Sequence, residues 1–188
     1  DQARFEVCGH KWADISEGSY GVSLMNDCKY GYSMKNRVMT QTLIKSGTEP
    51  NLTADQEEHF FTYSLYPHAG TWREAGTEQE ALNLNVPAKA VAGAAEKDRM
   101  EFLSVDKRDV VLETVKKAED GDGVIVRLYE VENARTKVTL HCAEAIASAE
   151  ETDLLENPIE GALGVKENEI ELTIKPYEIR TIRIRTAK

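Results

Sequence analysis

The sequence of 188 residues predicts an all-β fold, with antiparallel β-sandwich-like sheets in two lobes and only short helices. Three observations support this prediction: apolar and polar residues alternate over short runs, turn-forming residues separate the runs, and helical periodicity is sparse. Alternation with a period of two places the apolar side chains of a strand on one face. This pattern is typical of half-buried strands in a β-sandwich.

The alternating runs predict strands along the whole chain. In order, they lie at residues 5–7, 20–24, 38–44, 61–65, 110–112, 124–128, 138–142, 170–174 and 182–184. Gly, Asp, Asn and Pro between the runs predict hairpin turns at residues 27–31, 120–123, 132–135 and 175–178, because these residues favour turn conformations. The first of these turns is expected to join strands at 20–25 and 37–45. Arg183 and Arg185 alternate with isoleucines near the end, which favours an edge strand protected by charge.

Helical signals are sparse, and one of them, Thr53 with Gln56, has the spacing of a capping box that could open a single turn. The pairs Thr71 with Glu74 and Thr77 with Glu80 have the spacing of capping boxes. A short helix is predicted over 78–84, ending before Pro87.

The Ala-rich stretch 86–98 lacks β alternation, and we interpret it as a linker between two lobes. The predicted organisation is therefore 1–86 for the first part, 87–99 for the linker and 100–188 for a C-terminal β-sandwich domain. A surface loop within a single domain remains the alternative for this stretch.

Composition narrows the class of partner. The net charge of −10 disfavours nucleic acid, and the longest apolar runs fall far short of the length that crosses a bilayer. Three cysteines, an odd and low number, favour a reducing compartment and hence the cytoplasm. The opening residues contain no initiator Met or signal segment, so we expect the chain to be part of something longer. A homo-oligomer remains open.

No complete catalytic or metal-binding set is apparent. Cys8 and His10 would share one strand face, but His141 and Cys142 would point to opposite faces, so these four residues do not predict a zinc site. Asp14, Glu17 and Asp27 lie close in sequence, yet 33 acidic residues make such proximity common by chance. We therefore expect no metal site and no catalytic residue in this chain.

Exposed aromatic residues would suit a different function. Trp12, Trp72, Tyr30, Tyr32 and Tyr66 could form a platform that stacks on sugar rings, although aromatic residues of β-sandwiches more often fill the core. A stand-alone carbohydrate-binding module is therefore the main alternative function. A protein-interaction or oligomerisation domain is another.

Four stretches together resemble one family. They are "RFEVCGHKWADISEGSYGVSLMNDCKYGYSMKNRVMTQTLIKSGTEPN" (4–51), "HFFTYSLYPHAGTW" (59–72), "VVLETVKKAEDGDGVIVRLYE" (110–130) and "PYEIRTIRI" (176–184). In this order they resemble the C-terminal β region of α-mannosidases of glycoside hydrolase family 38, with the bacterial and cytosolic branch most similar. The resemblance is weakest over 83–97 and 148–165.

The resemblance implies the function of a larger enzyme. Members of this family hydrolyse α-mannosides in glycans with retention of configuration, using a zinc ion and an Asp nucleophile in an N-terminal catalytic domain. No His-x-Asp triplet of the metal site occurs in this chain, so zinc is expected only in the catalytic domain of the parent. The first part, 1–86, would then be the end of the large central β domain. The implied partners are the N-terminal catalytic domain of the same chain and the α-mannoside glycan.

The resemblance also places a candidate site in "NDCKYGY" (26–32). Asn26, Asp27, Lys29 and Tyr30 are expected to line the rim of the sugar pocket in the parent enzyme, because loops on a rigid scaffold often carry function. Relatives often have Arg where this chain has Lys45, which would remove a bidentate contact.

Overall fold

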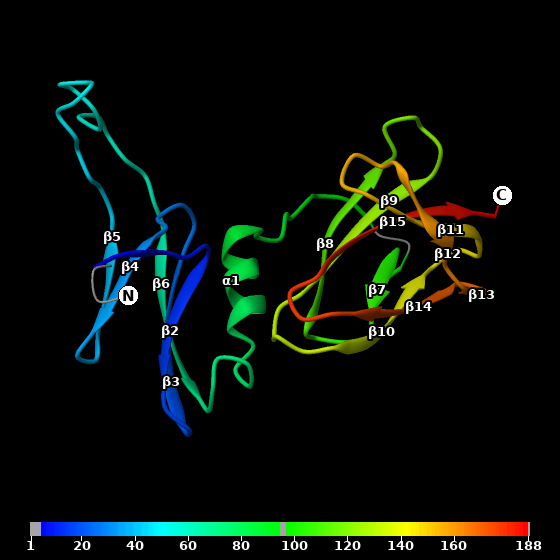
Figure 1. The fold of residues 1–188 in the computed structure, drawn as a ribbon, viewed down its shortest axis with the longest axis horizontal. Helices are drawn as coiled ribbons and strands as arrows, with labels where there is room; N and C mark the ends of the chain where they lie inside the picture. The colour runs from blue at the N-terminus through cyan, green and yellow to red at the C-terminus, as the bar shows by residue number, and fades with distance from the viewer. Residues whose placement is uncertain (1–4, 95–96, 188) are drawn as a thin grey trace. The chain divides into compact units, whose positions relative to one another are not determined.

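The computed structural model describes residues 5–94 and 97–187. The chain divides into two compact units, Asp1–Ala92 and Gly93–Lys188. Strands dominate both units, and the described residues contain a single α-helix (Figure 1). All paired strands within the sheets are antiparallel, which confirms the predicted all-β class. The described part of the chain contains no helix with the length and apolar character needed to span a bilayer.

The unit Asp1–Ala92 contains two three-stranded sheets. One has the order β1 (Val7–Cys8), β4 (Gly31–Lys35), β5 (Val38–Thr42), and the other the order β2 (Trp12–Ser16), β3 (Tyr20–Asn26), β6 (Tyr63–Ala69). The helix α1 (Thr77–Asn85) packs against β3 and β2 on one side of the second sheet (Figure 1).

The predicted hairpin at residues 27–31 is wrong. β3 pairs with β2 and β6, whereas β4 pairs with β1 and β5, so residues 27–30 cross from one sheet to the other. The tight hairpin of this region instead joins β4 to β5 through Asn36 and Arg37, whose φ angles are 53° and 65°. Positive φ at both central residues is the requirement of a two-residue hairpin turn that matches strand twist.

Of the three predicted capping boxes, that of Thr71 with Glu74 is present, whereas the Thr53 hydroxyl donates to Asn51 Oδ1 and Gln56 Nε2 donates to the Leu52 carbonyl. The backbone N–H of Thr71 donates to Glu74 Oε2 at 2.8 Å and the N–H of Glu74 donates to Thr71 Oγ1 at 3.4 Å. Thr77 is not a cap, because the cap residue is Gly76, with φ of 67°, and the Thr77 hydroxyl is buried 2.9 Å from that of Ser23. α1 begins at Thr77 and ends at Asn85, one residue beyond each end of the prediction.

The unit Gly93–Lys188 is a two-sheet sandwich. Its four-stranded sheet has the order β13 (Val165–Lys166), β14 (Glu169–Ile174), β10 (Thr136–Cys142), β7 (Leu103–Val105). Its five-stranded sheet has the order β12 (Pro158–Ala162), β11 (Ile146–Thr152), β15 (Ile179–Thr186), β9 (Val124–Glu130), β8 (Val110–Lys117). Aliphatic side chains from both sheets form one buried cluster, which includes Leu128, Leu140, Ile170 and Ile182.

Two further turn predictions for this unit are wrong. The 120–123 hairpin is present between β8 and β9, but the 132–135 and 175–178 segments connect strands of different sheets. The carboxylate of Glu130 explains these crossings: it is 1% exposed, and it accepts hydrogen bonds from the backbone N–H groups of Glu132 (2.7 Å), Ala134 (3.0 Å) and Tyr177 (2.9 Å). One buried side chain therefore anchors both connections.

The predicted edge strand near Arg183 and Arg185 is also wrong. β15 lies in the centre of its sheet, between β11 and β9. Arg183 is buried and donates to Asp120 Oδ2 at 2.6 Å, and Arg185 Nε donates to Asp122 Oδ2 at 2.7 Å. The two arginines thus bind the acidic residues of the β8–β9 hairpin, which satisfies their charge inside a central strand.

Glu156 gives this unit a pH dependence that can be measured. Its buried carboxylate accepts from Lys116 Nζ (2.7 Å) and the backbone N–H of Glu119 (2.8 Å), and these contacts hold its pKa below the ordinary value of 4.5. A lowered pKa stabilises the folded state above the ordinary value, and this contribution is lost as the pH falls through the folded-state value. In thermal unfolding followed by circular dichroism, the midpoint of Glu156→Gln should be lower than that of wild type at pH 7. The two midpoints should approach each other at pH 3. A difference that stays the same at both pH values would contradict this role.

Candidate functional site

The crossing between the two sheets of the unit Asp1–Ala92 is organised by Asn26. Its side chain is fully buried, its Oδ1 accepts from the Lys29 N–H at 2.7 Å, and its amide group donates to the Tyr32 hydroxyl. Its backbone carbonyl accepts from Asn85 Nδ2 at 2.9 Å, which connects the crossing to the end of α1. Because its polar groups are engaged inside the fold, Asn26 fixes the path of the chain and presents its neighbours.

Asp27 ties the crossing to the segment that precedes β6. Both carboxylate oxygens lie 3.0 Å from the backbone nitrogen of Thr62, and the Asp27 N–H donates to the Thr62 carbonyl at 3.2 Å. The Thr62 N–H and then the Cys28 thiol lower the pKa of Asp27, so this side chain is a carboxylate at neutral pH. The same hydrogen bond to Asp27 raises the pKa of the Cys28 thiol, which disfavours its reactive thiolate form.

Lys29 and Tyr30 face outward from the crossing. The Lys29 ammonium lies 5.0 Å from the centroid of the Phe61 ring, and the Tyr30 ring meets that of His10 edge-on at 4.6 Å between centroids. Tyr30 is 44% exposed. The four predicted site residues thus divide into two that hold the crossing, Asn26 and Asp27, and two whose side chains can contact another molecule.

A buried polar cluster lies between the second sheet and α1. Asp14 Oδ2 accepts from Ser23 Oγ at 2.7 Å and lies 2.8 Å from His68 Nε2, and Ser23 also contacts Thr77. Gly21 is required here, because a Cβ at this position would lie 2.4 Å from His68 Cε1. The acid lies between the serine and the histidine, and Ser23 and His68 are buried, so this cluster does not have the geometry in which a histidine activates a serine.

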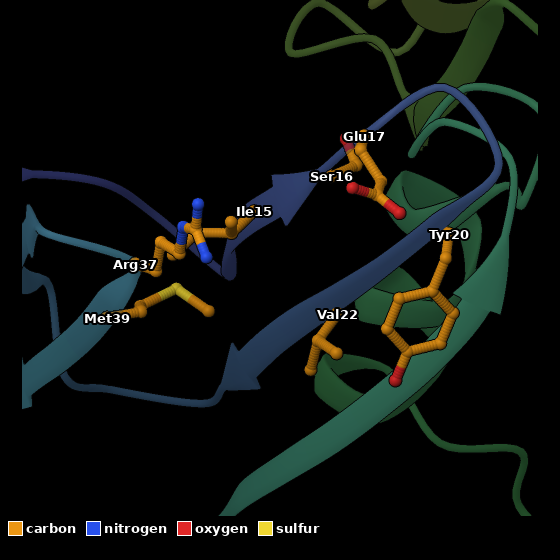
Figure 2. A pocket seen from close by; sticks show the side chains of 7 residues that line it. All are labelled: Ile15, Ser16, Glu17, Tyr20, Val22, Arg37 and Met39. Atoms are coloured by element: carbon orange, nitrogen blue, oxygen red, sulfur yellow. The ribbon is translucent and has the colours of Figure 1, made fainter.

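A pocket of about 470 Å³ opens on the other side of this sheet (Figure 2). It is lined by Ile15, Ser16, Glu17, Tyr20, Val22, Arg37 and Met39. In Figure 2, Arg37 and Met39 approach from the β4–β5 hairpin, and Tyr20 and Glu17 lie on the side of the β2–β3 hairpin. The sequence contains no motif for this pocket, because its lining comes from separate strands that only the fold brings together.

The structure gives no metal site among the described residues, and it engages four of the five aromatic candidates for sugar stacking within the fold. Among residues 5–94 and 97–187, no three His, Cys, Asp or Glu side chains are grouped so that they could hold a metal ion, so the described residues do not fit a zinc site. Trp12 and Trp72 pack on each other with ring centroids 5.0 Å apart, Tyr32 is buried, and the Tyr66 hydroxyl donates to the Ala75 carbonyl at 3.1 Å. Asp14 and Asp27 bind different partners, His68 and Thr62.

Comparison with protein families gives two matches. Residues 1–53 match the Glycosyl hydrolases family 38 C-terminal domain, and residues 109–182 match the Glycosyl hydrolases family 38 C-terminal beta sandwich domain. The second match covers most of the two-sheet sandwich, and the first includes β1 to β5 and the crossing at 27–30.

Several curated proteins are similar over nearly the whole chain. Alpha-mannosidase 2C1 of Homo sapiens is 37% identical over 188 residues, which is 97% of this chain and 18% of the relative. Alpha-mannosidase G of Dictyostelium discoideum is 38% identical over 194 residues, and an alpha-mannosidase of Saccharomyces cerevisiae is 31% identical over 208 residues. The chain therefore spans about one fifth of the length of these relatives.

Solved structures show the same fold. A glycosyl hydrolase family 38 protein from Enterococcus faecalis superposes with a TM-score of 0.72 at 20% identity, over 95% of this chain and 22% of that structure. An alpha-mannosidase from the same species gives a TM-score of 0.74, over 95% of this chain and 21% of that structure. The two family matches and the curated relatives show that the chain belongs to glycosyl hydrolase family 38 and forms part of the C-terminal β region of such a protein.

Proposed function

We propose that this chain is the non-catalytic C-terminal portion of a retaining, zinc-dependent α-mannosidase that hydrolyses α-mannosides in glycans. The observation that carries the proposal is 37% identity across 97% of the chain to an enzyme of which it matches only 18%. The catalytic carboxylates and the zinc ion then belong to the remainder of the longer polypeptide, which is also the partner of this region. The three cysteines are free thiols, which supports a reducing, cytoplasmic location.

The role of this region is that of a scaffold with one functional rim. Asn26 and Asp27 hold the crossing between two sheets in a fixed conformation through bonds of 2.7 Å to the Lys29 N–H and 3.0 Å to the Thr62 N–H. A fixed backbone presents the ammonium group of Lys29 and the phenol of Tyr30 in a defined direction. An ammonium donor and an aromatic ring are groups suited to sugar hydroxyls and to the apolar face of a sugar ring.

This role predicts a specific kinetic change. In the full-length enzyme, Lys29→Ala should lower kcat/KM for an aryl α-mannoside about tenfold, the effect expected when one hydrogen bond from a charged donor is lost. Asp27→Asn should have a similar effect by loosening the crossing, because an amide replaces one of the two acceptor oxygens that face the Thr62 N–H. Steady-state kinetics would measure both effects.

The matched control is Lys89→Ala, which removes an exposed lysine outside the crossing. This variant should leave kcat/KM and the thermal midpoint unchanged. Unchanged kinetics of Lys29→Ala and Asp27→Asn at unchanged stability would contradict the proposed rim. The assignment as a scaffold is tested separately, by comparing the activity of the full-length protein with that of the 188-residue chain.

A further inference from the structure

The two units differ sharply in the core that they contain. Among the described residues, nineteen hydrophobic side chains are buried, of which sixteen lie in the unit Gly93–Lys188 and only three, Met25, Tyr32 and Ala81, in the unit Asp1–Ala92. Units of similar length need a comparable apolar core to offset the entropy lost on folding. The described residues of the unit Asp1–Ala92 therefore form a much smaller apolar core than those of the sandwich.

The smaller core has a counterpart on the surface of the β2–β3–β6 sheet. Antiparallel register aligns Ile15 with Val22 and Pro67, and Leu24 with Leu65, on one face of the sheet. The same face carries Tyr20 and Tyr63, which lie at opposite ends of the paired segment of β3 and β6. Leu65 is 66% exposed, Tyr63 58% and Tyr20 52%. We call this set of seven residues the apolar face.

The opposite face of the same sheet is covered. It carries Asp14, Ser23 and His68, and α1 closes over it through the contact between Ser23 and Thr77. The covered face thus combines this polar cluster with Trp12, Met25 and Tyr66, whereas the apolar face leaves Leu65, Tyr63 and Tyr20 exposed. A contiguous apolar surface of this kind marks an interface.

We infer that the apolar face and the adjoining pocket pack against an apolar β surface from the remainder of the longer α-mannosidase polypeptide. This inference rests on the proposed function. Its occupant is indicated by length, because the matched region makes up only 18% of the human relative and 22% of one solved relative. The face of a second β-sheet would fit the apolar face, since sheets pack face to face about 10 Å apart with interdigitated apolar side chains.

The apolar part of the pocket lining fits this inference. Ile15, Val22 and Met39 supply apolar surface, while Glu17 and Arg37 are its charged groups. An aliphatic side chain from an opposing strand could bury its surface against the apolar part of this lining without leaving a polar group unpaired.

A charge placed on the apolar face tests the inference when its effect is measured both in the 188-residue chain and in the full-length enzyme. In the 188-residue chain, Leu65→Glu should shift the thermal midpoint by less than about 1 °C, because exposed substitutions have small effects. In the full-length enzyme the same change should lower the midpoint by at least about 5 °C, since a charge would be buried without a partner. The control, Thr173→Glu on an exposed position of β14, should give the same small shift in both. A small shift for Leu65→Glu in both contexts would overturn the inference.

Chemical labelling gives a second, independent measurement. A cysteine at Leu65→Cys should react with a maleimide in the 188-residue chain, and at least tenfold more slowly in the full-length enzyme, as read by peptide mass spectrometry. Thr173→Cys should react equally in both. Equal rates for the Leu65 variant would overturn the inference, and so would protection that increases with protein concentration, because that would identify a second copy as the occupant. Failure of the proposed function would be seen separately, as absence of α-mannosidase activity in the unmodified full-length protein.

Discussion

Replacing Glu130 with Gln is expected to lower the free energy of unfolding of the unit Gly93–Lys188 by about 3 kcal/mol, which is more than a hundredfold in the folding equilibrium. The carboxylate accepts three backbone hydrogen bonds with almost no exposure to water. An amide has one acceptor oxygen, and its NH₂ group would face backbone N–H donors. At least one N–H group would lose its partner inside the protein, and both connections that Glu130 anchors would loosen.

Amide hydrogen exchange is the suitable measurement. Both tryptophans, Trp12 and Trp72, lie in the unit Asp1–Ala92, so tryptophan fluorescence does not report on the sandwich. Peptides from β9, β10 and β15 should exchange at least a hundredfold faster in Glu130→Gln, whereas the exposed control Glu144→Gln should leave them unchanged. Unchanged exchange in Glu130→Gln would show that this carboxylate does not hold the two connections.

The fold class was predictable because it depends on a pattern that each strand carries by itself. Alternation in stretches such as 124–128 and 138–142 places Leu128 and Leu140 on inward faces without any knowledge of their partners. The 120–123 hairpin was predictable for the same reason, since Gly121 and Gly123 adopt the positive φ that their turn requires.

Strand pairing was not predictable from the same local signals. Turn-forming residues show that the chain reverses, but they do not distinguish a hairpin within one sheet from a crossing between two. At 132–135 and 175–178 the deciding group is Glu130, which lies outside the second segment by more than forty residues in the sequence. Likewise, the acids that hold Arg183 and Arg185 in a central strand come from the β8–β9 hairpin.

The candidate site was predicted only in part. The resemblance directed attention to residues 26–30, but only the structure separates Asn26, which is buried, from Tyr30, which is exposed. The apolar face could not be found from sequence, because the alternation in β3 and β6 does not reveal which face is covered. The polar side chains of Asp14, Ser23 and His68 would have suggested the solvent side, yet they lie beneath α1.

The largest expected effect is the difference in catalytic activity between the 188-residue chain and the full-length enzyme. The described residues contain no group that could hold a metal ion, and the acids Asp14 and Asp27 hold His68 and the Thr62 N–H. Glycoside hydrolysis needs two carboxyl groups on either side of the scissile bond, about 5 to 9.5 Å apart depending on the stereochemical course. Because we propose that this pair belongs to the remainder of the longer polypeptide, the 188-residue chain should supply none of the large rate enhancement of a glycosidase, which is typically at least about a millionfold.

Release of the aryl group from an aryl α-mannoside, measured in parallel for equal molar amounts of the full-length protein and the 188-residue chain with zinc present, tests this assignment most directly. The full-length protein should hydrolyse the substrate, and the 188-residue chain should release no more product than a protein-free blank. Turnover by the 188-residue chain, or none by the full-length protein, would contradict the assignment of this chain as the non-catalytic β region of an α-mannosidase.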